Sequence, residues 1–324
     1  MAEKFGIIGL GKMGGGIALR AMEMGYEVAG FDPSPSFGLA KAGVAFAPTL
    51  SDFVKALPKP RRIFLWLPAG PLVDNTCNAL AELLEAGDVI VDGGNSYWGD
   101  SIRRAEKYRA IQLHLLDLGT SGGIDGARHG PCFMIGGPAA AVKLVEPLLL
   151  DLATPGGYVH AGPNGAGHFV KLVHNGIEFG ILQAIGEGME LLARFPMPLK
   201  IAPTLECWRN GSVIRSWLID LMARSYAQDP DFRNPSGYIE DTGEVNWLIG
   251  DALNLDVPIP VIAQSVMALL RSRETTQVSD KSVIAMRHEF GGHPFGPDPH
   301  IRAEREHGKV GPFHRFDSGT EQRH

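Results

Sequence analysis

The stretch "FGIIGLGKMGGGIALRAMEMG", residues 5–25, decides the fold of this 324-residue chain. It begins with a short apolar run that is typical of a buried strand, and it ends in a segment with the apolar periodicity of an amphipathic helix. Gly9, Gly11 and Gly14 lie between the two, in GxGxxG spacing. A glycine-rich turn that joins a strand to a helix is typical of α/β domains that bind nucleotides.

The glycine spacing predicts a dinucleotide site. The first glycine permits the tight turn, the second lets the backbone approach a pyrophosphate, and the third allows close packing at the positive end of the helix. The next β-type run, "EVAGFD" (27–32), ends in Asp32, whose carboxylate would accept hydrogen bonds from both hydroxyls of an adenosine ribose. The predicted cofactor-binding residues in this part of the chain are Gly9, Leu10, Gly11, Lys12, Met13, Gly14 and Asp32.

Asp32 also predicts the choice of cofactor. Its carboxylate would repel the 2′-phosphate of NADP, and the following residues, "PSPS" (33–36), offer no arginine to bind that phosphate. The sequence therefore favours NAD, with NADP as the weaker alternative.

The organisation of the chain predicts an α/β fold, a doubly wound Rossmann-type parallel sheet followed by an all-helical C-terminal domain. Short apolar runs bounded by Gly, Pro or Asp recur at 62–68, 88–94, 113–119 and 132–137. From Gly162 onward the strand signal fades. We predict a dinucleotide-binding domain over 1–161, a helical substrate and dimerisation domain over 162–293, and a Gly/Pro-rich, then charged tail over 294–324.

Composition and charge exclude several classes of function. The net charge of −6 argues against non-specific binding to nucleic acid. No apolar run reaches the roughly 18 residues that a membrane span needs, and only four residues precede the first apolar run, which leaves no room for a signal segment. Cys77, Cys132 and Cys207 lie too far apart for a zinc site or a redox dithiol. We expect a cytoplasmic protein without a metal.

A polar stripe marks the helix predicted over "HFVKLVHNGIEFGIL" (168–182). Lys171, His174, Asn175 and Glu178 fall within one wedge of roughly 100°, at the i, i+3, i+4, i+7 spacing that core residues normally fill. Apolar residues flank the stripe on both edges: Val170, Ile177 and Ile181 on one, Leu172 and Phe179 on the other. A solvated helix face does not usually have such neighbours, so the pattern predicts a buried stripe with a chemical role.

Several segments resemble one family. They are "DGGNS" (92–96), "GTSGGIDGARHGPCFMIGG" (119–137), "GPNGAGHFVKLVHNGIEFG" (162–180), "WRNGSVIRS" (208–216) and "RHEFGGH" (287–293). With the glycine loop they are similar to the decarboxylating 6-phosphogluconate dehydrogenases, in the short-chain branch of the β-hydroxyacid dehydrogenase family. The resemblance covers residues 5 to about 293. It implies oxidative decarboxylation of 6-phosphogluconate to ribulose 5-phosphate and CO₂ with reduction of NAD, in the pentose phosphate route.

The resemblance also implies the site residues. Lys171, Asn175 and Glu178 would be catalytic. The residues that would bind substrate are Asn95, Ser121, Gly122, Gly123, His174, Thr242, Arg215, Arg287 and His293, and Asn95 would also contact the cofactor. In the family the tail arginine and histidine come from the neighbouring subunit. Arg287 and His293 therefore imply a homodimer or homotetramer with a shared active site.

The chemistry needs a base and an acid. Oxidation of a secondary alcohol requires a base to take the hydroxyl proton while hydride leaves. Lys171 can do so only when neutral, and burial would lower its pKa from about 10.4 toward about 7–8. Reprotonated Lys171 would polarise the carbonyl of the β-ketoacid as CO₂ leaves, and Glu178 would protonate the enediol that remains.

Two departures from the family pattern leave the substrate open. The family usually has tyrosine where this chain has Phe179, and lysine where "GYIEDTGEVNW" (237–247) aligns Glu240, and both family residues contact phosphate. A non-phosphorylated aldonate is therefore one alternative. A non-decarboxylating dehydrogenase of 3-hydroxyisobutyrate or tartronate semialdehyde is another, and a catalytically silent NAD-binding regulator is a third.

Overall fold

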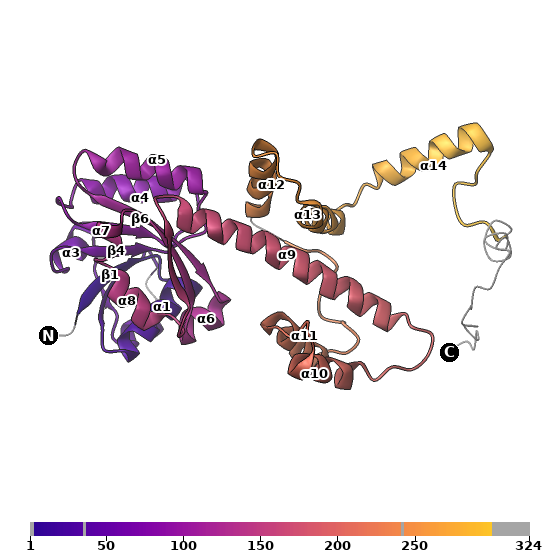
Figure 1. Ribbon diagram of the computed structural model, residues 1–324, viewed down its shortest axis with the longest axis horizontal. Coiled ribbons are helices and arrows are strands. Elements are labelled where there is room, and N and C mark those ends of the chain that lie inside the picture. The colour runs from indigo at the N-terminus through magenta and orange to yellow at the C-terminus, as the bar shows by residue number, and fades with distance from the viewer. Residues whose placement is uncertain (1–2, 35–36, 241–242, 300–324) are drawn as a thin grey trace. The chain divides into compact units, whose positions relative to one another are not determined.

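The computed structural model describes residues 3–34, 37–240 and 243–299, without the side chains at 290 and 291. The chain forms two compact units, Met1–Ile177 with Gly243–Pro258 and Glu178–Thr242 with Ile259–His324 (Figure 1). The first unit thus includes residues 162–177 and 243–258, although the sequence pattern places both segments in the helical domain. The predicted boundary after residue 161 stays a prediction.

The first unit is built on one eight-stranded sheet of order β3-β2-β1-β4-β5-β6-β7-β8 (Figure 1). The strands are β1 (Lys4–Ile8), β2 (Glu27–Phe31), β3 (Ala45–Phe46), β4 (Arg62–Leu65), β5 (Val89–Asp92), β6 (His114–Ser121), β7 (Cys132–Gly136) and β8 (Tyr158–Gly162). The helices are α1 (Lys12–Glu23), α2 (Phe37–Ala42), α3 (Leu50–Lys55), α4 (Pro71–Ala81), α5 (Trp98–Arg109), α6 (Gly123–His129), α7 (Ala139–Val142), α8 (Glu146–Leu152), the first part of α9 (Ala166–Ala193) and α12 (Glu244–Asn254). Strand order reverses at β1, as in doubly wound nucleotide-binding sheets. The predicted Rossmann-type fold is confirmed.

The prediction that all strands of the sheet are parallel is wrong for one strand. The run at 132–137 forms strand β7, but β7 is antiparallel to β6, with Asp117 opposite Gly136 and Ser121 opposite Cys132. Residues 122–131 hold only the seven-residue helix α6, whereas a parallel crossover needs about a dozen residues or more. Pairing with β5 ends at Asp117, so the last part of β6 pairs with β7 alone.

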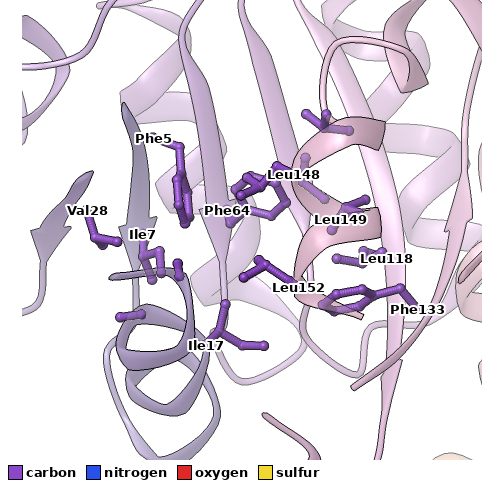
Figure 2. Packing of buried hydrophobic residues seen from close by; sticks show 14 of the residues in the cluster. Phe5, Ile7, Ile17, Val28, Phe64, Leu118, Phe133, Leu148, Leu149 and Leu152 are labelled. Carbon is purple, nitrogen blue, oxygen red and sulfur yellow. The ribbon is translucent and has the colours of Figure 1, made fainter. Parts of the chain in front are cut away.

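Two apolar cores lie on the two faces of the sheet. Phe5 and Ile7 of β1 join one core, together with residues of α1 and α8 (Figure 2), while Ile8 joins the other, together with residues of α3, α4 and α5. Successive side chains of a strand point to opposite faces. Because both faces are covered, the strands read as continuous apolar runs rather than alternating ones.

The second unit contains only helices among its described residues: the rest of α9, then α10 (Ile201–Gly211), α11 (Trp217–Gln228), α13 (Pro260–Ser272) and α14 (Val278–Gly291). The prediction of a helical C-terminal part is confirmed. Leu205 of α10 and Ile219 of α11 are buried, and Arg209 binds Asp220 at 3.0 Å between the same helices. Among the described residues no helix combines the length and apolar character that crossing a membrane requires.

Candidate active site

The glycine loop has the geometry that a pyrophosphate site requires. A Cβ atom at Gly9 would lie 2.4 Å from the carbonyl oxygen of Trp66, and one at Gly14 would lie 2.1 Å from that of Gly9. Neither position can hold a larger residue while α1 and β4 keep their places. A Cβ at Gly11 would meet no atom within 4 Å, so this glycine borders open space. The protein backbone and a bound pyrophosphate can therefore come close together at Gly11.

Asp32 follows β2 and lies beside the glycine loop. Its Oδ2 accepts a hydrogen bond from the Leu10 backbone N–H at 2.7 Å, and its Oδ1 accepts one from that of Ser34 at 2.8 Å. Each carboxylate oxygen has a further lone pair. The carboxylate is thus fixed in orientation and can still accept hydrogen bonds from a ribose.

Asn95 lies in the turn after β5. The turn is held by Asp92, a fully buried carboxylate that accepts hydrogen bonds from Ser96 Oγ at 2.7 Å and from Arg104 Nη1 at 3.3 Å. The side chain of Asn95 is exposed, and its amide donates to the carboxylate of Glu244. Sequence reasoning missed Glu244; its only local signal is an acidic residue in the first turn of α12.

Helix α12 is held to the first turn of α5 by Asp251, which is buried. Its carboxylate accepts hydrogen bonds from Trp98 Nε1 at 2.8 Å and from the Tyr97 hydroxyl at 3.2 Å. Desolvation and, after it, the charge of Asp251 raise the pKa of Tyr97. Tyr97 therefore stays protonated and keeps donating to Asp251. Through this contact the fold places Glu244 beside the turn that carries Asn95.

The polar stripe of α9 meets the end of β6. Lys171 and Asn175 are buried, with exposed fractions of 9% and 6%, and the Lys171 ammonium donates to Asn175 Oδ1. His174 is half-buried; its Nε2 lies 3.0 Å from Ser121 Oγ and its Nδ1 lies 3.4 Å from Asn175 Oδ1. Direct contacts thus join four of the predicted site residues.

Close packing of backbone against the helix explains how Lys171 is placed. A Cβ atom at Gly119 of β6 would lie 2.5 Å from the Cβ of Lys171. Past Ser121 the chain turns through Gly122, whose φ of +114° lies in the region that favours glycine. The turn then enters α6 at Gly123.

The predicted apolar shell around the stripe is wrong at one edge. Val170, Ile177 and Ile181 have exposed fractions of 39%, 53% and 42%, whereas Leu172 on the other edge is buried. The polar face itself lies against β6, so glycine backbone and polar partners bury Lys171. The residues on the exposed edge point away from that contact.

Four further predicted site residues lie in the second unit: Glu178, Arg215, Arg287 and His293. Glu178 is half-buried, two turns beyond Lys171 on α9. Arg215 is exposed between α10 and α11. Arg287 Nη2 and His293 Nδ1 lie 3.5 Å apart at the end of α14. Thr242 lies outside the described residues.

Comparison with known families identifies both parts of the chain. Residues 4–162 match the model described as the NAD binding domain of 6-phosphogluconate dehydrogenase, and residues 167–291 match that of the 6-phosphogluconate dehydrogenase C-terminal domain. The chain belongs to the 6-phosphogluconate dehydrogenase family. The resemblance inferred from the sequence motifs is therefore confirmed, as is the oxidoreductase class.

Known members of the 6-phosphogluconate dehydrogenase family match this chain over most of its length. A Bacillus subtilis (strain 168) protein that is named as a candidate 6-phosphogluconate dehydrogenase is 41% identical over 90% of this chain and 98% of its own length. An NAD(+)-dependent, decarboxylating 6-phosphogluconate dehydrogenase of Haloferax volcanii is 39% identical over 90% and 97%. The structure of Plasmodium falciparum 6-phosphogluconate dehydrogenase superposes with a TM-score of 0.75 at 27% identity, over 91% of this chain and 66% of that chain.

Proposed function

We propose that this protein oxidises and decarboxylates 6-phosphogluconate with NAD, releasing ribulose 5-phosphate and CO₂. The observation that carries the proposal is the buried Lys171, which donates to Asn175, while His174 contacts both Asn175 and Ser121. The Haloferax volcanii relative, which is named for this reaction and for NAD, supports the assignment.

The residues of the first unit fit a bound NAD. Gly11 leaves open space for a pyrophosphate beside the N-terminus of α1, and the fixed carboxylate of Asp32 suits the two hydroxyls of an adenosine ribose. That carboxylate would repel the 2′-phosphate of NADP. When bound there, NAD supplies the hydride acceptor.

Lys171 performs the first proton transfer. As a neutral amine it takes the proton of the substrate's β-hydroxyl while the hydride of the same carbon leaves, and the product is a β-ketoacid. Asn175, one turn on, orients the amine through the hydrogen bond that the two side chains share. Ser121 and His174 bind hydroxyl groups of the sugar acid, and the 3.0 Å contact between Ser121 Oγ and His174 Nε2 supports a shared role.

The same lysine serves the second step. Its ammonium form donates a hydrogen bond to the ketone, so that the electron pair of the breaking C–C bond moves onto that carbonyl as CO₂ departs. The resulting enediol takes its proton at carbon from Glu178, which lies seven residues further along α9. Seven residues are about two helical turns, so a single helix, α9, carries both the base and the acid.

Arg215 and Arg287 are the residues proposed to bind the phosphate, since a guanidinium group can donate to two phosphate oxygens at once. Arg287 and His293 are supplied by a second copy of the chain, which makes the active enzyme a homodimer or homotetramer. The large exposed apolar side chains of the second unit, such as Leu191, Val261 and Val278, support an oligomer.

The deciding experiment measures CO₂ release alongside NADH formation for 6-phosphogluconate, gluconate and 3-hydroxyisobutyrate. We expect equal amounts of the two products from 6-phosphogluconate. Lys171→Met should lower turnover by at least about 10³-fold while leaving NAD binding within about twofold. NADH without CO₂ would refute decarboxylation and favour the non-decarboxylating alternative.

A non-phosphorylated aldonate is the second candidate substrate, and the ion pair between Glu240 and Arg273 favours it. Glu240, at the position where the family has a phosphate-binding lysine, forms an ion pair with Arg273 at 3.2 Å. An acidic residue at that position suits a free aldonate better than a sugar phosphate. Equal kcat/KM for gluconate and 6-phosphogluconate would refute the arginine clamp and establish the aldonate as substrate.

A further inference from the structure

Asp117, in the middle of β6, has a fully buried carboxylate. Its Oδ1 accepts a hydrogen bond from the Gly165 backbone N–H at 2.7 Å, and its Oδ2 accepts one from that of His168 at 2.9 Å. These N–H groups lie at the start of α9, where a helix has no carbonyl partners of its own. A side chain of the sheet therefore caps the helix that carries Lys171.

The backbone around this carboxylate leaves no room for adjustment. Gly136 is the register partner of Asp117 on β7, and a Cβ atom there would lie 2.7 Å from both carboxylate oxygens. A Cβ atom at Gly167 would lie 2.5 Å from the carbonyl oxygens of Asp117 and Met134. The first turn of α9 thus packs directly on the backbone of β6 and β7.

The charge of Asp117 ties it to the helix. Asp92, its register neighbour on β5, is equally buried but has Arg104 as a cationic partner. Asp117 instead accepts from the positive end of a helix of 28 residues. A buried carboxylate is unfavourable unless hydrogen bonds compensate it. Any sliding or rotation of α9 would break those hydrogen bonds, so the carboxylate resists such motion.

We propose that Asp117 is the positioning residue of the site, which sets the height and rotation of α9 and thereby the position of the Lys171 amine. The inference rests on the proposed role of Lys171. Gly119 follows Asp117 by two residues on β6, and Lys171 follows Gly165 by six residues. Gly119 packs directly against the side chain of Lys171. Because these separations along the strand and the helix are short, a displacement at Asp117 also displaces the Lys171 amine. A displacement of about 1 Å can lower a catalytic rate about 100-fold.

The test compares Asp117→Asn with Asp88→Asn, a control at a second buried carboxylate that accepts backbone N–H bonds. Asp88 is also buried and also accepts two backbone N–H bonds, from Arg61 at 2.6 Å and Glu85 at 2.9 Å. Among the described residues it differs from Asp117 in also pairing with the Arg61 guanidinium at 2.8 Å, and it precedes β5, at the amino end of the strands. Asparagine keeps the shape of aspartate, yet its NH₂ group opposes one of the N–H donors. We expect Asp117→Asn to lower kcat about 10- to 100-fold with KM for NAD unchanged within about twofold. Asp88→Asn, at equal folded fraction, should lower kcat less than about twofold.

Equal losses of kcat in the two variants, or a loss confined to KM for NAD, would overturn the proposal. Hydrogen exchange of the unsubstituted protein is a second measurement that needs no variant. The amides of Gly165 and His168 should exchange as slowly as those of β6, and rapid exchange would also overturn it. The proposed function is tested separately, by comparing the turnover of the wild-type protein with that of Lys171→Met. If the wild-type protein is inactive but the amides of Gly165 and His168 exchange slowly, only the proposed function is refuted.

Discussion

Lys171 shows how an amine can be buried although only one of the two apolar edges beside it is buried. Its ammonium group has Asn175 as a partner, and its stem lies against glycine backbone, while one apolar edge of its own helix is exposed. The spacing of the polar stripe correctly brings Lys171, His174 and Asn175 to one face. The partner surface was not predictable, because a helix pattern shows which face is polar but not what that face meets.

We also expect the choice between NAD and NADP to depend on single residues, Asp32 and Pro33. Asp32→Asn combined with Pro33→Arg should raise the preference for NADP over NAD by about 100-fold, because a repulsive carboxylate is replaced and a guanidinium group can bind the 2′-phosphate. The measurement is the ratio of kcat/KM for the two cofactors.

Pro33→Arg alone is the control for that double change. It keeps the carboxylate that accepts from Leu10 and Ser34, and should shift the ratio much less. If the double variant keeps the wild-type ratio, the ribose does not lie at Asp32.

At the scale of elements, the helix that carries Lys171 is positioned by its close packing against strand β6. Gly119 lies where β6 meets α9, and the added methyl group of Gly119→Ala would overlap the stem of Lys171. We expect a loss of about 1–3 kcal/mol in the free energy of unfolding, from overpacking, and at least a tenfold lower kcat. Chemical denaturation and steady-state kinetics check the two effects.

Gly186→Ala is the matched control on the same helix. A Cβ atom there meets nothing within 4 Å, so alanine should stabilise the helix by up to about 1 kcal/mol and leave kcat unchanged. Similar losses of kcat at both positions would show that the effect of Gly119→Ala is not local to Lys171.

The strands show what the sequence can and cannot reveal at this scale. Apolar runs predicted β1, β2, β4, β5, β6 and β7 because these strands are buried. The pattern missed β3, which has two residues, and β8, whose residues are exposed or half-buried, because neither has a buried apolar run. The direction of β7 depends on the length of its connection rather than on its own residues.

For the whole molecule, the proposed sharing of the active site between subunits gives a complementation test. Lys171→Met and Arg287→Ala chains should each be nearly inactive alone. If Lys171 of one subunit works with Arg287 of its partner, random mixing into dimers leaves one intact site in each mixed dimer, so about a quarter of all sites should be active.

The mixture is prepared by denaturing and refolding the two variants together, and activity is assayed against each variant refolded alone. An inactive mixture that contains mixed dimers would contradict the sharing of sites. Sequence alone indicated this arrangement only through the family motif at Arg287 and His293, since no local pattern records which copy of a chain a side chain serves.

The reversal at β7 has a consequence for divergence within the family. Past Asp117, strand β6 is no longer paired with its parallel neighbour β5 and pairs only with β7, and this extension of the strand ends at Ser121. The glycine loop follows β1 and Asp32 follows β2, and β4 and β5 separate these two strands from β6 in the sheet. The end of β6 at Ser121 can therefore vary in sequence within the family without disturbing the glycine loop or Asp32.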